Sequence, residues 1–266
     1  MAKKTQNDSS AVDSSVNLVK LFPSVITIIG LCLGLSAIRF ALYDQWHEAA
    51  AFIVFAALVD AVDGRIARMM NACSEFGAQL DSLSDFVNFG VAPAMILYLW
   101  QGQNIKGLDW AVTLFFAICV AIRLARFNTE LGDANLPGWS DRFFIGIPAP
   151  AGAMLALAPM GIDFAFKTES PALYEFLSFT QTPLFVYAYA AMIGALMASR
   201  LPTFSFKTIR IKKRYASLAL IGVTLLIIAA FVEPWYTILG VGIWYISTIP
   251  LSLLKFYITS RKESKL

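Results

Sequence analysis

The chain has 266 residues, of which 58% are hydrophobic and 15% are charged, and its formal net charge is +3. Soluble domains of this length carry about 25% charged residues, so the composition argues against a soluble domain and predicts an integral membrane protein. The small positive charge gives no indication of nucleic-acid binding, because the lysines and arginines stand mostly between apolar segments.

The first elements in chain order are a polar N-terminus, residues 1–13, expected to be disordered, and residues 14–22, which predict a short interfacial helix ahead of Pro23. Crossing the hydrocarbon core takes about 20 mostly apolar residues. The apolar stretches predict eight transmembrane helices over residues 25–43, 48–69, 77–100, 109–128, 144–165, 183–200, 216–232 and 236–257. The expected fold is therefore an all-α, polytopic transmembrane bundle. A basic cytoplasmic loop, 201–215, separates the last two helices from the rest, and a cytoplasmic tail, 258–266, follows them.

The lysines and arginines predict the orientation of this bundle. With the N-terminus inside, 18 of the 21 basic residues fall on the cytoplasmic side, and only Arg39, Lys106 and Lys167 fall outside. Cytoplasmic loops carry an excess of Lys and Arg, so an even number of spans with both termini cytoplasmic is favoured.

Four aspartates, Asp60, Asp63, Asp81 and Asp85, stand in segments that otherwise resemble membrane helices. At 100° per residue, the two aspartates of the second helix share an arc of about 140° with Gly64, Ala67 and Arg68. The two of the third helix share an arc of about 100° with Gly77, Ser84 and Asn88. Because only a short turn separates these helices, the two polar faces are expected to oppose each other near the cytoplasmic end.

Four converging carboxylates repel one another, and burial raises that cost. Protonation is one remedy, and binding of hard divalent cations, which prefer oxygen ligands, is the other. Two such ions could clamp the attacking and leaving oxygens of a phosphoryl transfer. A proton or cation pathway is the alternative, although transporters place their sites near the midplane at broken helices.

The spacing can also be compared with known families. Residues 60–85 read D-x2-D-G-x2-A-R-x8-G-x3-D-x3-D, with the fixed residues Asp60, Asp63, Gly64, Ala67, Arg68, Gly77, Asp81 and Asp85. This pattern resembles the signature of the CDP-alcohol phosphatidyltransferases, membrane enzymes with a six-helix core that make phospholipids. Residues 76–94, 123–128 and 146–152 are similar to the bacterial membrane-bound phosphatidylserine synthases within that family, whereas Ser24 stands where asparagine is common.

The resemblance implies a role for each matching residue. Asp60, Asp63, Asp81 and Asp85 would bind two divalent cations, Mg²⁺ or Mn²⁺, and Asp85 would also be the general base. The cytidine and diphosphate of CDP-diacylglycerol would meet residues from both faces and from the flanking segments: Thr27, Gly64, Ala67, Arg68, Ser74 and Gly77. Arg123, Arg126 and Asn88 are the candidates for binding the acceptor alcohol, the arginines by a two-point grip on its carboxylate.

The implied reaction transfers the phosphatidyl group from CDP-diacylglycerol to the hydroxyl of L-serine, with release of CMP. Choline, inositol or glycerol phosphate as acceptor, and a divalent-cation or proton-coupled transporter, remain the alternatives. The resemblance further implies a homodimer in the bacterial cytoplasmic membrane, with membrane lipids as its other partners.

Overall fold

The computed structural model describes residues 18–69, 74–102, 105, 107–131, 143–204 and 215–263. The N-terminal segment 1–13, residues 14–17, most of the basic loop 201–215 and the last three residues of the tail lie outside the described residues.

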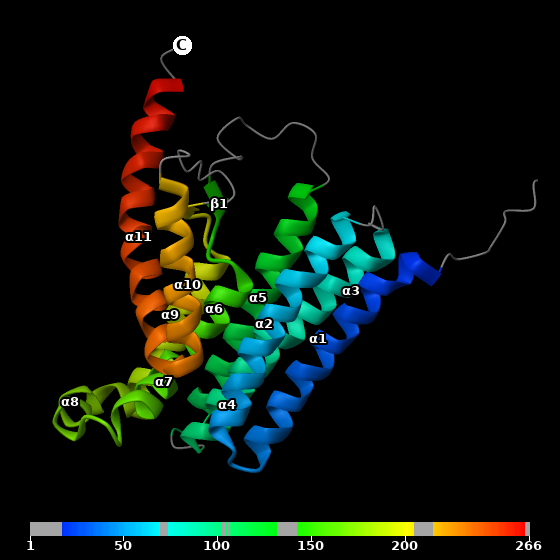
Figure 1. Cartoon of the computed structure of the whole chain (residues 1–266). Coiled ribbons are helices and arrows are strands. Elements are labelled where there is room, and N and C mark those ends of the chain that lie inside the picture. Colours follow the sequence, from blue (N-terminus) through cyan, green and yellow to red (C-terminus); the bar gives the residue numbers. More distant parts are fainter. Residues whose placement is uncertain are drawn as a thin grey trace, which may run out of the picture.

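The described chain is a bundle of helices with one short two-stranded ribbon (Figure 1). Its elements are α1 (Leu18–Leu42), α2 (Trp46–Met69), α3 (Glu75–Asp85), η1 (Phe86–Val91), α4 (Ala92–Gln101), α5 (Leu108–Leu131), β1 (Phe143–Ile145), α6 (Ala149–Ala156), α7 (Ala158–Phe166), α8 (Pro171–Leu177), η2 (Ser178–Gln181), α9 (Pro183–Ala198), β2 (Pro202–Phe204), α10 (Ala216–Val232) and α11 (Pro234–Glu263).

Helices α1 and α2 form an antiparallel hairpin with a tight connection through Asp44, whose φ is 59°. The interface holds small buried side chains, among them Ala37, Ala41, Ala49 and Ala50. In hydrocarbon the hydrophobic effect does not hold helices together, so close backbone approach at small residues supplies the packing energy.

The interfacial helix expected over residues 14–22 is not a separate element where the structure describes it. Leu18 to Leu42 form one helix with Pro23 inside it, so residues 18–22 are its first turns. Pro23 is the sixth residue of this helix, so it removes one backbone hydrogen bond, the one that an amide at position 23 would donate to the Val19 carbonyl.

The third predicted span is a helix interrupted by a π-helical turn, η1, between α3 and α4. Pro93 stands just after this turn and lacks the amide hydrogen that would donate to Phe89 in a regular α-helix. The extra residue in the turn changes the rotation of α3 relative to α4. The turn begins immediately after Asp85.

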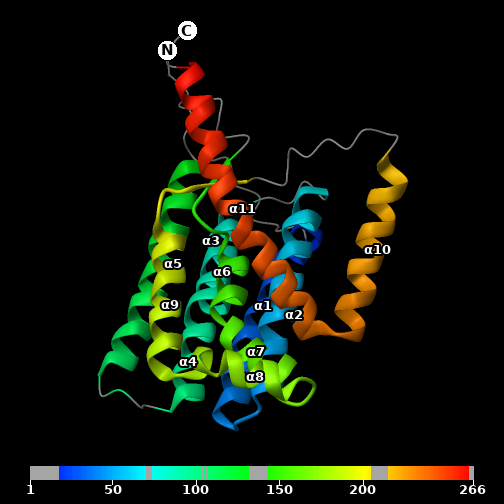
Figure 2. The same ribbon diagram turned by 90° about the vertical axis from the view of Figure 1, so that its left-hand side faces the viewer.

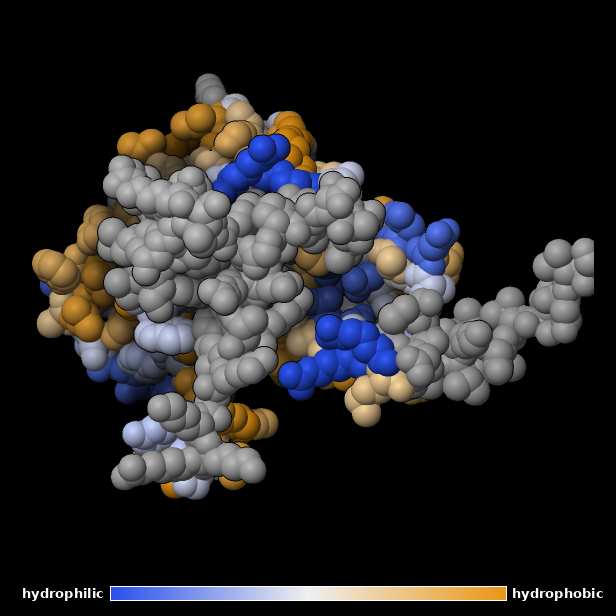
Figure 3. Space-filling model, turned by 90° about the horizontal axis from the view of Figure 1, so that it is seen from above, coloured by the Kyte–Doolittle hydropathy of each residue, from blue (hydrophilic) through white to orange (hydrophobic). Residues whose placement is uncertain are grey.

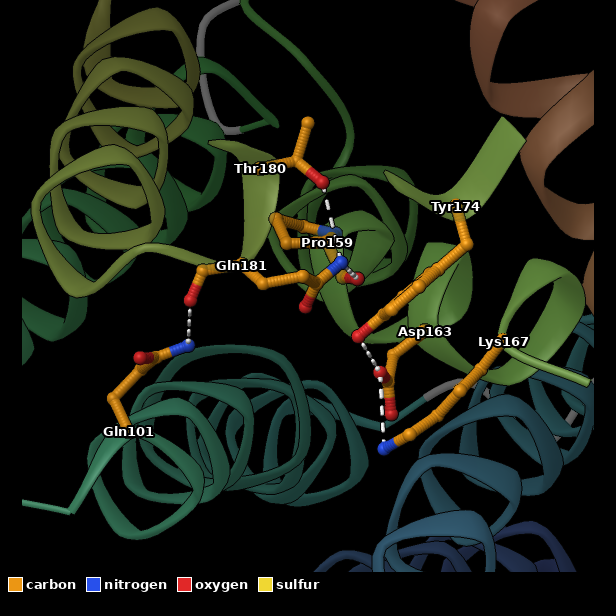
Figure 4. A network of polar contacts seen from close by, with 7 residues as sticks. All are labelled: Gln101, Pro159, Asp163, Lys167, Tyr174, Thr180 and Gln181. Atoms are coloured by element: carbon orange, nitrogen blue, oxygen red, sulfur yellow. Dashed lines mark hydrogen bonds and ion pairs between the residues drawn. The ribbon is translucent and has the colours of Figure 1, made fainter. Parts of the chain in front are cut away.

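The fifth predicted span, 144–165, is two short helices, α6 and α7, bent by 50° at Leu157. The residues after it, which belong to no predicted span, form α8 and η2, and this segment meets α9 at 69°. Side-chain hydrogen bonds hold the region together (Figure 4): Gln181 Nε2 donates to the Pro159 carbonyl at 2.9 Å, and Tyr174 Oη donates to Asp163 at 2.7 Å. Gln101 Nε2, from the end of α4, reaches the Gln181 carbonyl at 3.4 Å.

Strands β1 and β2 pair antiparallel, with Ile145 opposite Pro202, and join the segment before α6 to the segment after α9. Gly146 follows β1 with a φ of 77°, and a Cβ there would lie 2.6 Å from the Met197 carbonyl oxygen. Glycine is therefore required at this crossing, both for the positive φ and for the close backbone approach.

Helix α11 lies across α6 and α7, and α10 stands at the edge of the bundle (Figures 1 and 2). Most of the α10 side chains that the structure describes are exposed and apolar, for example Leu218 and Phe231. In a membrane such a surface faces lipid.

Three described segments are long and apolar enough to span a membrane: Phe22–Leu42, Glu75–Gln101 and Leu108–Thr129. The two bent pairs raise that number to five, and α10 is too short by the same measure. The prediction of a helical membrane bundle is confirmed, whereas the predicted number of eight spans is not. Helix α2 has the length of a span, but it carries the charged residues of the candidate site described next.

Candidate metal centre and active site

Helix α2 ends and α3 begins at the same end of the bundle (Figure 1), and carboxylates of the two helices meet there. One oxygen from each of Asp60, Asp63 and Asp81 lies within 4.8 Å of the others. The side chain of Asp85 is adjacent to that of Asp60, so the fourth carboxylate adjoins the same cluster. Seen from this end, hydrophilic residues gather between apolar flanks (Figure 3). The convergence predicted from the two helical faces is confirmed.

Asp63 is the most buried of the four, with 4% of its surface exposed. Thr27 Oγ1 of α1 lies 2.9 Å from Asp63 Oδ2 and 3.2 Å from the Pro23 carbonyl oxygen. A hydroxyl has one proton, and the shorter contact is to the charged acceptor, which makes the stronger hydrogen bond. The other oxygen, Asp63 Oδ1, is buried and has no hydrogen-bond partner among the described residues.

These observations fit a bound divalent cation. A buried carboxylate oxygen without a donor is costly, and a cation held jointly by Asp60, Asp63 and Asp81 would satisfy it. The donor set consists only of carboxylate oxygens, which suits Mg²⁺ or Mn²⁺ rather than a softer metal. The cluster is therefore a candidate metal centre.

A chain of polar contacts continues from this cluster into the bundle. Ser84 Oγ donates to the Thr27 carbonyl at 3.3 Å, and Asn88 Nδ2 donates to Ser84 Oγ at 3.2 Å. Asn88 is 1% exposed and lies in η1 against α1, where a Cβ on Gly34 would overlap its side-chain amide. Asn88 is thus packed between helices, and its predicted contact with the acceptor alcohol stays a prediction.

The residues expected to surround CDP-diacylglycerol lie at the same end of the bundle. A Cβ on Gly64 would meet no described atom within 4 Å, so the surface there is open. Gly77 lies against Ser74, whose Oγ accepts a hydrogen bond from the Gly77 amide at 3.0 Å and so caps the N-terminus of α3. Arg68 is exposed, and its Nε donates to the Gly64 carbonyl at 2.9 Å. Ala67 belongs to α2, and its side chain lies outside the described residues.

The two candidate acceptor arginines of α5 have different surroundings. Arg123 Nε donates to the Ile147 carbonyl at 2.6 Å, and its guanidinium lies within electrostatic range of Asp60 and Asp85. Arg126 Nη1 donates instead to the carbonyls of Ala198 and Ser199, at 2.9 and 3.3 Å, where it caps the C-terminus of α9. Arg123 therefore lies beside the aspartate cluster, whereas Arg126 lies at the end of α9.

Three residues of this region were missed as candidates. Ser84 stands on the aspartate face, so the helical spacing already contained its signal. Gly34 lies one helical turn from Gly30, a small-residue spacing typical of close helix contacts. Ile147 contributes a backbone carbonyl, for which the sequence has no signal.

Comparison with known proteins agrees with this geometry. The profile of the CDP-alcohol phosphatidyltransferases matches residues 20–180. A Mycobacterium bovis protein named CDP-diacylglycerol–serine O-phosphatidyltransferase is 36% identical over 238 residues, covering 90% of this chain and 79% of the relative. Proteins of the same name from Helicobacter pylori and Bacillus subtilis are 35% and 33% identical, over 82% and 70% of this chain and 85% and 90% of their own lengths. The chain is a membrane enzyme that belongs to the CDP-alcohol phosphatidyltransferase family.

Proposed function

We propose that this enzyme transfers the phosphatidyl group of CDP-diacylglycerol to the hydroxyl of L-serine, giving phosphatidylserine and CMP. The observation that carries the proposal is the convergence of Asp60, Asp63 and Asp81 within 4.8 Å, with Asp85 beside them, inside the matched family region. The names of these relatives, which are 33–36% identical to this chain over the aligned residues, support serine as the acceptor.

The four aspartates have the cation-binding role in this proposal. Asp60, Asp63, Asp81 and Asp85 would hold two divalent cations, Mg²⁺ or Mn²⁺. When bound, such cations polarise phosphoryl oxygens and neutralise the charge that develops on the leaving phosphate. Thr27 positions Asp63 through its hydrogen bond.

Asp85 is proposed as the general base. The serine hydroxyl oxygen attacks the β-phosphorus, which carries the diacylglycerol, and the proton of that hydroxyl passes to the Asp85 carboxylate. The bond from the β-phosphorus to the bridging oxygen breaks, and CMP leaves with that oxygen on its α-phosphate. A serine hydroxyl is a weak nucleophile at neutral pH, so a base within hydrogen-bond reach is required.

The donor nucleotide is proposed to lie on the open surface around Gly64, with Ala67 and Gly77 beside it and Arg68 near the diphosphate. The Arg68 guanidinium uses one donor for the Gly64 carbonyl and retains others for phosphate. The Ser74 hydroxyl accepts from the Gly77 amide and can still donate its own proton to a phosphate oxygen.

Arg123 is the better candidate for the serine carboxylate. Its Nε is held by the Ile147 carbonyl beside Asp60 and Asp85, which leaves the two terminal nitrogens for a bidentate contact. Arg126, with one terminal nitrogen on α9, and the buried Asn88 are weaker candidates.

The proposal also includes the setting of the site. It comprises eight spans with both termini cytoplasmic, the aspartate end facing the cytoplasm, a location in the bacterial cytoplasmic membrane and a homodimer. The family core would cover residues 14–200 and the additional helices residues 216–257. The count of basic residues supports this orientation.

An acceptor screen tests the proposed function. Purified enzyme with CDP-diacylglycerol and Mg²⁺ or Mn²⁺ is expected to release CMP with L-serine, and not with choline, inositol, glycerol phosphate or serinamide, which lacks the carboxylate. A chelator should abolish the release, and added metal should restore it. If CMP is released with a different alcohol and not with serine, that alcohol is the acceptor. Metal flux without CMP release would favour a transporter.

The variant Arg123→Lys sharpens this screen, because lysine keeps the charge and loses the two-point grip. The KM for serine is expected to rise by roughly 10- to 100-fold, with a small change in the KM for CDP-diacylglycerol. Arg126→Lys is the matched control and should leave the KM for serine within about threefold, since its guanidinium caps α9. Equal KM values for Arg123→Lys and the parent enzyme would remove this residue from the acceptor site.

A further inference from the structure

A large apolar cavity lies beside the candidate site, between the two bent helix pairs and the C-terminal helices. Its volume is about 750 Å³, and its walls come from α6 to α9 on one side and from α10 and α11 on the other. The lining side chains are apolar or aromatic apart from two threonines, with Met154, Tyr189, Leu226 and Val241 on different walls. The space is partly open to the outside, since Val241 and Ile243 in its lining are 42% and 70% exposed, and a large apolar groove that opens into a membrane is filled by hydrocarbon.

The lining decides the chemistry of that occupant. A buried water needs two to four polar partners, and these walls offer few. A charged or strongly polar ligand would lose its hydration without compensation. A hydrocarbon chain has no hydrogen bonds to lose on entering such a space and makes dispersion contacts along its length.

The end of the cavity that is lined by Tyr245 and Ala151 adjoins the catalytic region. Tyr245, which lines the cavity, lies within electrostatic range of the Arg123 guanidinium, which is itself close to Asp85. Ala151, also in the lining, lies in the first turn of α6, four residues after Ile147, whose carbonyl accepts the Arg123 hydrogen bond. The cavity therefore begins where the lipid end of a bound donor would leave the diphosphate.

The length of the cavity also suits a lipid chain. Its lining on α11 runs from Ile246 to Tyr236, away from the aspartate end and toward the start of the helix (Figure 2). Ten residues of helix span about 15 Å, which is half of the roughly 30 Å hydrocarbon core and so the depth of one leaflet.

We propose that this cavity binds one acyl chain of CDP-diacylglycerol, with the diphosphate at the aspartates and the chain between α9 and α11. The inference rests on the proposed function and adds to it a donor-binding site built partly from the C-terminal helices, beyond the matched family region. A lipid with its head group at the aspartates and its chain in this cavity would be fixed at both ends, so the cavity contributes to donor affinity.

A cavity-filling variant and a matched control test this proposal. Val241 of α11 and Val223 of α10 are 42% and 54% exposed, but only Val241 lines the cavity. Val241→Trp is expected to raise the KM for dioleoyl CDP-diacylglycerol about tenfold or more, because a few methylene groups lose their burial. The KM for a dihexanoyl donor, whose chains are too short to fill the cavity, should stay within twofold, and Val223→Trp should change neither value.

The proposal is overturned if Val241→Trp leaves both KM values unchanged or raises both alike. It is also overturned if turnover falls with both donors and recovers with added phospholipid, because a bystander lipid then fills the cavity.

An activity-independent readout separates this inference from the proposed function. A CDP-diacylglycerol analogue with a photoreactive acyl terminus should label residues 236–246 in the parent and in Val223→Trp, and not in Val241→Trp. If the parent enzyme is labelled there but releases no CMP, the proposed function is wrong and the acyl-chain site stands. If it releases CMP but is not labelled there, the proposed function stands and the acyl-chain site is wrong.

Discussion

At the residue scale, the threonine beside the aspartate cluster controls how the buried carboxylate is presented. Thr27 donates to one oxygen of Asp63, and the other oxygen is left without a partner among the described residues. Groups that orient a ligand carboxylate fix its rotamer, so the remaining oxygen keeps a constant direction toward the cation. The contribution of Thr27 is therefore indirect, and its effect should appear in metal affinity before it appears in substrate affinity.

Thr27→Val is expected to raise the Mg²⁺ or Mn²⁺ concentration for half-maximal activity by roughly 10- to 100-fold, since valine keeps the shape and loses the donor. Thr113→Val is the matched control. Both threonines are buried, at 6% and 7% exposed, and both contact the carbonyl four residues earlier, but only Thr27 also contacts a carboxylate. Metal titrations of CMP release, and of cation binding by calorimetry, measure the effect. A similar shift in both variants would show that Thr27 has no special role.

At the element scale, the π-helical turn η1 links the packing of the membrane helices to the aspartates. Asp85 immediately precedes this turn, and Asn88 within it packs against α1 and donates to Ser84. π-Turns inside α-helices are common at functional sites because the added residue changes which side chains face the site. The close approach of η1 to α1 depends on Gly34, since any side chain there would overlap Asn88.

Gly34→Ala is expected to displace η1, break the contact between Asn88 and Ser84, and reduce turnover by roughly 10- to 100-fold, because small shifts of catalytic groups are costly. Its Cβ would also lie 3.1 Å from the Asn88 Cα, so the side chain cannot simply rotate away. Gly30→Ala, one turn earlier on the same helix face, meets only ordinary contacts, the nearest 3.5 Å from Val59, and should keep activity within about threefold.

Thermal melting in detergent separates a shifted active site from a misfolded chain in this pair. Melting temperatures close to that of the parent, together with a selective loss of turnover in Gly34→Ala, are the expected outcome. If Gly34→Ala does not fold, the double variant Gly34→Ala/Asn88→Ala should fold, because only the 3.1 Å contact with the Cα of residue 88 then remains and a shift of a few tenths of an ångström relieves it. Equal activity of the two glycine variants would contradict the proposed link.

At the scale of the whole molecule, the bundle has two polar ends, and the proposed site lies at one of them. The aspartate cluster, Arg68 and the N-terminus of α3 lie at one end, and the ion pair of Lys167 with Asp163 lies at the other. The excess of basic residues supports our proposal that the first end faces the cytoplasm. Serine would then enter the site from the cytoplasm, and CMP would leave to the cytoplasm.

Cysteine labelling tests this orientation. In a chain with Cys32, Cys73 and Cys119 replaced by serine, Arg65→Cys and Lys167→Cys place single thiols at opposite ends of the bundle. In right-side-out vesicles a membrane-impermeant maleimide should react with Lys167→Cys and not with Arg65→Cys, and inverted vesicles should reverse the result. Both sites are exposed, so detergent-solubilised protein should label at both and serves as the control. Labelling of both from one side would contradict the arrangement.

The sequence by itself determined the class of fold, the two polar helix faces and the convergence of the aspartates. Apolar length and helical periodicity are local properties, so the segments of α1 to α5 and the face shared by Asp60 and Asp63 could be read residue by residue. The same reasoning placed Gly77, Asp81 and Asp85 on one face of the next helix. The pattern of eight fixed residues between Asp60 and Asp85 identified the family, because the spacing of residues is also a local property of the sequence.

Only the tertiary structure decided which groups those faces contact. The π-turn at η1, the bend between α6 and α7 and the helix α8 depend on backbone hydrogen bonds and packing that have no periodic signal in the sequence. The separate surroundings of Arg123 and Arg126 arise because two backbone carbonyls, from Ile147 and Ala198, come to α5 from distant segments. The acyl-chain cavity likewise exists only because α11 lies across α6 and α7. A sequence gives the chemistry of each side chain, but a contact between segments far apart in the chain is fixed by how whole helices pack.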